Sequence, residues 1–210
     1  MNELGRGLLQ HHNGSALYMI AKANRSADAL VGIILDTFPG FRDCVDTNEW
    51  ENAPTKSPPF EWESAKSLPS VIHFYKRAQI AVADIWAALG RHPAQNTNAS
   101  LQICQFKDMN LITTFPDYRV PQILRHVDVL QYEPSLANSV DEQVELEKGG
   151  VHEASIRAGT VVAVDEIVQS VKMKLSTVAA DSDAERSQSD LQKLADDVTA
   201  VTIDWYLWQR

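Results

Sequence analysis

The chain has 210 residues, enough for one domain, and its 44% hydrophobic and 22% charged residues allow a sizeable core. Its formal net charge is −9 with no cluster of basic residues, which disfavours a polynucleotide partner but not a single nucleotide. Cys44 and Cys104 lack a CxxC spacing, no secretory signal opens the chain, and no apolar run reaches the ~20 residues of a membrane span. We therefore expect a cytoplasmic protein with no membrane partner.

The predicted elements are mainly helical. A first helix begins at the N-cap Ser26, carries its apolar residues on one stripe and stops at Pro39-Gly40. The clearest helix covers residues 70–90, and it is apolar over so much of its circumference that it should be central to the fold. The sequence does not show the alternation of strands with helices that would indicate a parallel sheet. Further helices are predicted at residues 121–130, 136–147, 154–175 and 191–208.

Two connections stand out between these helices. The loop at residues 40–69 is long for a compact domain, so it is either functional or partly mobile. Trp50, Phe60 and Trp62 within it indicate that parts of the loop pack back onto the body. The polar, acidic segment 180–190 is expected to be a mobile connection. The chain as a whole, residues 1–210, is predicted to form a single helical domain.

The stretch TTFPDYRVPQ, residues 113–122, sets two charged side chains among aromatic rings and prolines. Proline is favoured at the first helical position, so a helix that starts at Pro121 leaves Asp117 in the approach loop. In one interpretation Asp117 has a local structural role: it pairs with Arg119 or caps a turn, and Phe115 and Tyr118 lie in the core. In the other, the Asp117 carboxylate faces a pocket. The residues alone leave both interpretations open.

Other stretches repeat the theme of charges beside aromatic rings. The terminal IDWYLW allows two interpretations. Either the two tryptophans anchor the helix and Asp204 is solvated, or Asp204 lies in an aromatic-walled site. FPGFRD (38–43) and FYKRAQ (74–79), the second with Lys76 and Arg77, have the same character. Aromatic faces stack on bases and cations bind phosphate, so together these stretches suit a small planar ligand with an anionic end.

Several other kinds of site are not indicated. The six histidines are scattered without metal-ligand spacing, and no Gly-rich phosphate loop or GxSxG turn is present, so no metal site or cofactor is expected. One charged group does follow a helical spacing, and a solvated or ion-paired helix face explains it. Its members are Glu153, Arg157, Asp165 and Glu166.

Four stretches taken together carry a resemblance. FPGFRD, FYKRAQIAVADIW, TTFPDYRVPQIL and DWYLW occur in this order and resemble the queuosine salvage protein family, the queuosine 5′-phosphate N-glycosylase/hydrolases. HEASIRAGTVVAVDEI is similar to a further family segment. The match extends from about Asn2 to Trp208, and its most specific element is Phe-x-Asp-Tyr-Arg-x-Pro-Gln, which Phe115 to Gln122 satisfy.

The resemblance implies a mainly α fold related to that of DNA glycosylases. It also implies a hydrolase that cleaves the N-glycosidic bond of queuosine 5′-phosphate and releases queuine for salvage into tRNA modification. Asp117 would be the catalytic carboxylate, Phe115 would lie against the base, and Asp204 would bind the ligand from the C-terminal helix. The resemblance also implies candidates for the ribose-phosphate end of the substrate, which are Tyr206, Lys76, Arg77 and Arg119.

The resemblance also carries an expectation about the start of the chain. Family members have an N-terminal segment, with a histidine of the ligand site, before the point where this sequence begins, so we expect a shortened chain whose uncovered surface is open to a protein partner. The alternative function is a catalytically silent helical module that binds a nucleotide or a protein. A DNA glycosylase is disfavoured by the acidic balance and the missing Gly-rich hairpin signature.

Overall fold

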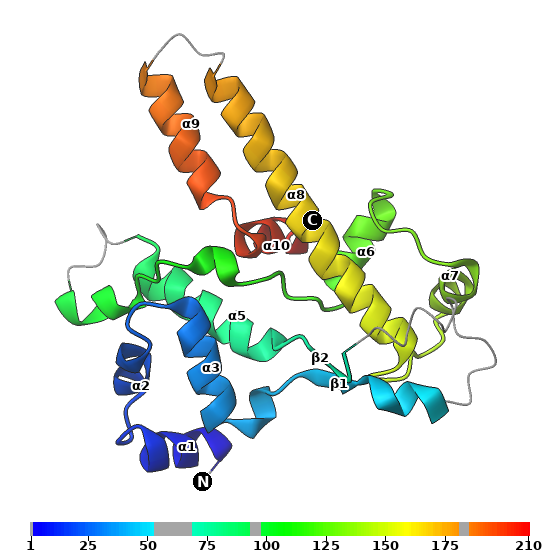
Figure 1. Cartoon of the computed structure of the whole chain (residues 1–210), viewed down its shortest axis with the longest axis horizontal. Coiled ribbons are helices and arrows are strands. Elements are labelled where there is room, and N and C mark those ends of the chain that lie inside the picture. The colour runs from blue at the N-terminus through cyan, green and yellow to red at the C-terminus, as the bar shows by residue number, and fades with distance from the viewer. Residues whose placement is uncertain (1, 53–68, 93–97, 181–184) are drawn as a thin grey trace.

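The chain folds mainly into helices, as the sequence predicts (Figure 1). The structure is a computed structural model that describes residues 2–52, 69–92, 98–180 and 185–210. Within these ranges no helix combines the length and the apolar character that a membrane crossing requires. The mobility expected for residues 53–68 and 181–184, and the packing expected for Phe60 and Trp62, lie outside the described residues.

Three helices at the N-terminal end begin at side-chain caps. Asn2, Ser15 and Ser26 each accept a hydrogen bond from a backbone N–H in the following turn, which satisfies donors that a helix start leaves unpaired. Leu30 in the third helix is fully buried, and the helix predicted from Ser26 is confirmed. The helices are α1 (Glu3–His11), α2 (Ala16–Lys22) and α3 (Ala27–Thr37).

A small antiparallel sheet replaces the start of the helix predicted at 70–90. Strand β1 (Cys44–Asp46) pairs with β2 (Val71–His73). The prediction is wrong here because β2 begins with two β-branched residues, which suit a strand, and because β1 supplies partners for its backbone. Helix α5 begins only at Lys76, after Tyr75 adopts a left-handed conformation with φ of 50°.

Helix α5 (Lys76–Ile85) lies at the centre of the fold, as predicted. Val82 is fully buried in a core cluster that also contains residues of α2 and α3. A π-helical turn, Trp86–Gly90, ends the helix. A Cβ at Gly90 would lie 1.9 Å from the backbone oxygen of Cys104, so this close approach requires a residue without a side chain.

The described part of the loop predicted at 40–69 is partly regular, since it contains β1 and 3-10 helices. Trp50 is buried, and its Nε1 donates a hydrogen bond to the Gly149 oxygen at 2.8 Å. The packing predicted for this tryptophan is therefore confirmed. The 3-10 helices of the described chain are Pro39–Phe41, Thr47–Asn52, Ala99–Cys104 and Met109–Leu111.

The C-terminal half is organised around one long helix, α8 (Val151–Ala180), which extends the predicted helix at both ends. Its N-terminal part packs against the rest of the molecule, and its far end runs beside α9 as a projecting hairpin (Figure 1). Leu124 of α6 and Val164 of α8 belong to a second core cluster between these helices and the last helix. The shorter helices are α6 (Arg119–His126) and α7 (Pro134–Asp141).

The single helix predicted at 191–208 is wrong, because two helices occupy this region. They are α9 (Glu185–Asp197) and α10 (Ala200–Trp208). Thr199 and Thr202 form a capping box in which each hydroxyl accepts a hydrogen bond from the other residue's backbone N–H, at 3.3 and 2.9 Å. This arrangement starts a new helix at α10, and α9 already begins within the connection expected at 180–190.

Candidate active site

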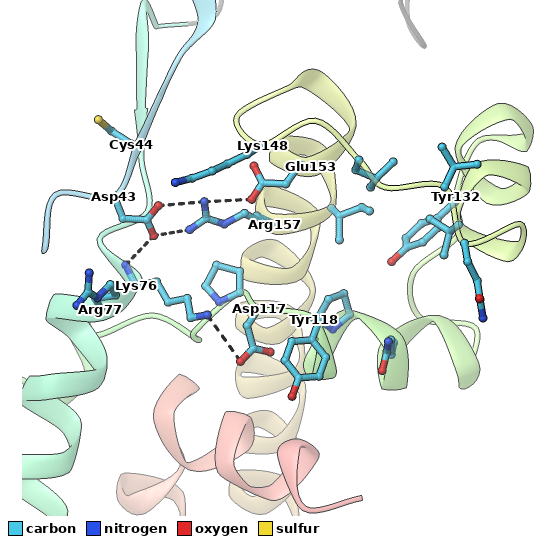
Figure 2. Close-up of a pocket in the computed structure, with 18 of the residues that line it drawn as sticks. Asp43, Cys44, Lys76, Arg77, Asp117, Tyr118, Tyr132, Lys148, Glu153 and Arg157 are labelled. Carbon is cyan, nitrogen blue, oxygen red and sulfur yellow. Dashed lines mark hydrogen bonds and ion pairs between the residues drawn. The ribbon is translucent and has the colours of Figure 1, made fainter. Parts of the chain in front are cut away.

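A pocket of about 750 Å³ lies between the starts of α5, α6 and α8 (Figure 2). The chain as a whole is acidic, yet in the described lining of this pocket the cationic side chains outnumber the carboxylates. Such a local excess favours an anionic group in the ligand. The cations are Arg42, Lys76, Arg77, Lys148 and Arg157, and the carboxylates are Asp43, Asp117 and Glu153.

Asp117 lies in this pocket, in the turn that leads into α6. Its Oδ1 accepts a hydrogen bond from the Arg119 backbone N–H at 2.9 Å, and its Oδ2 lies 3.8 Å from Lys76 Nζ. The side chain is 17% exposed. The structure therefore combines the two interpretations that the sequence left open, because one carboxylate oxygen caps a turn while the side chain faces a pocket.

The two cations of the FYKRAQ stretch come from the first turn of α5. Lys76 points toward Asp117 (Figure 2). Arg77 donates a hydrogen bond from Nη1 to the Gly40 oxygen at 2.8 Å, and its guanidinium lies 5.0 Å from the centre of the Phe41 ring. Arg77 thus lines the pocket and also ties α5 to the segment that follows α3.

Asp204 is buried and lies outside the described lining of the pocket. Its Oδ2 accepts hydrogen bonds from Thr114 Oγ1 at 2.6 Å and from the Phe115 backbone N–H at 2.8 Å. Burial raises the pKa of Asp204, the two hydrogen bonds act in the opposite direction, and the charge of Asp117 raises it further. Asp204 therefore fixes the backbone two residues before Asp117.

The other predicted residues have different surroundings. Phe115 is buried in the core cluster around α3 and α5, as one alternative expected, but the core position expected there for Tyr118 is wrong, because Tyr118 is 69% exposed and lines the pocket. Tyr206 is exposed, and its hydroxyl accepts a hydrogen bond from Arg210 Nη2. The structure brings Lys76, Arg77 and Asp117 to the pocket, and it leaves Phe115, Arg119, Asp204 and Tyr206 outside the described lining.

On the α8 side of the pocket, Glu153 and Arg157, which the sequence indicated as a charged helix face, form a cluster with Asp43, which the sequence did not place there (Figure 2). Both terminal nitrogens of Arg157 donate to the Asp43 carboxylate, Nη1 at 3.1 Å, and Nη1 also lies 3.4 Å from Glu153 Oε1. Of the two alternatives for the Glu153 and Arg157 face, the ion-paired one is correct. The sequence signal that links Asp43 to Arg157 was that both lie in stretches that carry the family resemblance.

The pocket also has an aromatic side, which comes from Tyr118 and Tyr132 (Figure 2). Burial raises the pKa of Tyr132, while the charge of Arg125, whose guanidinium lies 4.9 Å from its ring centre, lowers it. Aromatic faces accept planar bases by stacking. Among the described residues no group of three or more His, Cys, Asp or Glu is arranged to hold a metal ion.

The helical fold and this pocket define a mainly α protein whose site pairs a carboxylate with cations and aromatic rings, which suits a small, planar, anionic ligand. A family model described as queuosine salvage protein matches residues 1–54 and 58–210. The chain belongs to the queuosine salvage protein family.

Curated relatives agree with this assignment. The chain is 32% identical over 211 residues to a queuosine 5′-phosphate N-glycosylase/hydrolase of Dictyostelium discoideum, and the alignment covers 100% of this chain and 50% of the relative. It is 30% identical over 208 residues to the protein of the same name in Sphaerobacter thermophilus, with 99% and 49% covered. For the Bos taurus protein of this name the identity is 30% over 209 residues, with 99% and 49% covered. The chain thus spans about half the length of the curated relatives it matches.

Proposed function

We propose that this chain hydrolyses the N-glycosidic bond of queuosine 5′-phosphate and releases queuine for salvage into tRNA modification. One observation carries the proposal: the Asp117 carboxylate faces the Lys76 ammonium at 3.8 Å inside a pocket of about 750 Å³. The names of the relatives support the choice of substrate.

The proposed reaction needs a group that stabilises positive charge. The bond between ribose C1′ and the base nitrogen breaks, the base takes up a proton, and a water oxygen bonds to C1′. Charge accumulates on the sugar in an oxocarbenium-like state, as in glycoside hydrolysis. In this proposal Asp117 stabilises that charge, as a nucleophile or as an electrostatic partner that positions the water. A largely enclosed carboxylate does so better than one in bulk water.

The geometry around Asp117 supports this role. Its Oδ1 is held by the Arg119 backbone N–H, so the carboxylate is oriented before substrate binds. A preoriented charge needs little reorganisation during reaction. Asp204 would act indirectly, because its hydrogen bond to the Phe115 N–H holds the chain that leads to Asp117. Direct ligand contacts by Phe115, Asp204, Tyr206 and Arg119 stay predictions.

The substrate's phosphate and base suit different sides of the pocket. A phosphate monoester carries roughly −1.5 to −2 charges at pH 7, and Lys76 and Arg77 are its proposed partners among the lining cations. A phosphate would compete with Asp117 for Lys76, which lies at the long ion-pair distance of 3.8 Å. The rings of Tyr118 and Tyr132 would then be available to the base.

The proposal includes a cytoplasmic location and a small-molecule substrate without a polynucleotide. Free thiols at Cys44 and Cys104 suit a reducing compartment. The protein partner considered from the sequence is not part of the proposed function.

The test is incubation of the purified 210-residue chain with queuosine 5′-phosphate, followed by mass spectrometry of free queuine. Asp117→Asn keeps an oxygen that can accept from the Arg119 N–H but removes the charge, and we expect it to lower kcat by about 10²–10³-fold. Asp84→Asn, at an exposed position of α5 outside the described lining, is the matched control and should retain the parent rate.

The outcomes separate the proposed function from its alternative. Queuine release by the parent and by Asp84→Asn, but not by Asp117→Asn, supports the glycosylase. A folded parent that binds the substrate in calorimetry without releasing queuine would instead indicate the catalytically silent module. Equal rates for parent and Asp117→Asn would remove Asp117 from the mechanism.

A further inference from the structure

We infer that Asp43 is a positioning residue for the proposed reaction and acts through Lys76. This inference rests on the proposed function. Asp43 lies just before β1 and lines the same pocket as Asp117. Its contacts connect the backbone of α5 with the side of α8 (Figure 2).

Asp43 holds three consecutive N–H groups at the start of α5. Its backbone oxygen accepts hydrogen bonds from Phe74 N at 2.9 Å and Tyr75 N at 3.0 Å, and its Oδ2 accepts one from Lys76 N at 3.2 Å. The first N–H groups of a helix have no partners within it, and a carboxylate there is also favoured by the helix dipole. A single residue therefore pairs the N–H groups of Phe74, Tyr75 and Lys76, the last of them through its side chain.

The backbone at this point needs such support. Tyr75 has a left-handed φ of 50°, a conformation that carries strain of about 1–3 kcal/mol for a residue other than glycine. Strained residues persist where surrounding contacts over-determine them. The hydrogen bonds from Tyr75 and its neighbours to Asp43 supply those contacts, and the strained turn sets the direction in which Lys76 leaves the backbone.

Asp43 is itself anchored by α8. Arg157 donates from both terminal nitrogens to its carboxylate, a two-pronged geometry that orients as well as attracts. The Arg157 side chain is 11% exposed, and its guanidinium lies 3.9 Å from the centre of the Phe74 ring. Glu153, one turn earlier on α8, also pairs with Arg157. A continuous set of contacts thus runs from α8 through Arg157 and Asp43 to the backbone of Lys76.

This set of contacts ends at the ion pair between Lys76 and Asp117 in the pocket. Lys76 Nζ already lies at the long ion-pair distance of 3.8 Å from Asp117 Oδ2, so a shift of the Lys76 backbone away from the pocket would take Nζ out of reach of Asp117 and of a bound phosphate. A misplacement of about 1 Å in a reacting site can lower the rate about 10²-fold. Loss of the Asp43 carboxylate keeps the two hydrogen bonds to the Asp43 backbone oxygen but removes the one from Lys76 N and the pairing with Arg157. It should therefore impair the reaction even though Asp43 need not touch the substrate.

The test compares Asp43→Ala with Asp46→Asn in the parent and in a Lys76→Ala background. Asp46 lies three residues further on, at the end of β1, is exposed, and its carboxylate accepts hydrogen bonds only from Asn48 among the described residues. We expect Asp43→Ala to lower kcat/KM about 10²-fold, with little further loss once Lys76 is alanine, because residues that act as a unit are not additive. Asp46→Asn should match the parent in both backgrounds.

A second readout does not depend on turnover. Acetic anhydride labels exposed amines, and mass spectrometry of peptides reports the labelling of Lys76. We expect Lys76 to be labelled severalfold faster in Asp43→Ala than in the parent or in Asp46→Asn. Asp43→Asn, which keeps an acceptor for the Lys76 N–H, should give an intermediate rate and serves as the test variant should the alanine variant not fold.

The outcomes are distinguishable from failure of the proposed function. A parent that releases no queuine overturns the function, and the labelling rates then decide the positioning role alone. If Lys76 is labelled equally in all folded variants, or if Asp43→Ala lowers kcat/KM as much without Lys76 as with it, Asp43 does not act through Lys76.

Discussion

Asp204→Ala is expected to lower the free energy of unfolding by about 2–6 kcal/mol. The Asp204 side chain accepts two hydrogen bonds, from Thr114 Oγ1 and from the Phe115 N–H, in a place where the residue is 3% exposed. Alanine leaves both donors buried without a partner, and each such donor costs about 1–3 kcal/mol. This loss is a large part of the ~5–15 kcal/mol that stabilises a typical domain.

Asp204→Asn separates the hydrogen bonds from the charge. An amide oxygen can accept from both donors, so we expect this variant to be more stable than Asp204→Ala. Burial raises the folded-state pKa of Asp204 above its ordinary value of 3.8, so the unfolded chain loses this proton first as the pH rises. The parent should therefore lose stability as the pH rises from about 3.8 through the folded pKa. The Asp204→Asn variant has no carboxyl group to titrate at this position, so it should not show this pH-dependent loss of stability.

Urea denaturation at several pH values measures both effects. Trp205, next to Asp204, stacks with Trp86 at a centroid distance of 6.2 Å and provides a fluorescence signal close to the change. An alanine variant within about 1 kcal/mol of the parent would refute the count of two unsatisfied donors. A constant difference between parent and Asp204→Asn across the pH range would refute the pKa argument.

Two further predictions concern packing. Leu124→Ala should lower the free energy of unfolding by about 2–5 kcal/mol, because the side chain is 1% exposed between α6 and α8; a loss below 1 kcal/mol in urea melts would contradict this. Gly90→Ala should destabilise by about 1–3 kcal/mol or more, because its Cβ would lie 1.9 Å from the Cys104 oxygen. Gly32→Ala, within α3 and with open space around the new Cβ, should instead stabilise by about 0.5–1 kcal/mol. Thermal melts compare the two glycine variants, and equal shifts of their melting temperatures would contradict this expectation.

The elements that the sequence predicted well are those with local signals. The helix from Ser26 has its cap and its apolar stripe within a few residues, and the helix that contains Val164 is periodic over many turns. Two predicted helices were wrong, one because of a contact between distant residues and one because of a local cap within the predicted helix. The start of the predicted helix at 70–90 is a strand because of its pairing with residues 44–46, far away in the sequence. The break at Thr199 is local, and its threonine pair could have been recognised.

The same division applies to the candidate site. Two sequence motifs drew attention to Asp117 and to Lys76 and Arg77, because charges beside aromatic rings are unusual enough to notice, and the structure brings all three residues to one pocket. Asp43 and Arg157 also lie in charged stretches that the sequence indicated, but nothing local showed that they pair, because their ion pair joins residues 114 positions apart.

By itself, the sequence determined that this protein is mainly helical and where charged residues lie among aromatic ones, because periodicity, caps and motifs are properties of neighbouring residues. Only the tertiary structure decided what those charges contact. Asp204, predicted to bind the ligand, holds the backbone of Phe115, which lies 89 positions away, and Asp43 holds the start of α5. Such contacts depend on how helices pack, and packing brings together residues that share no local pattern.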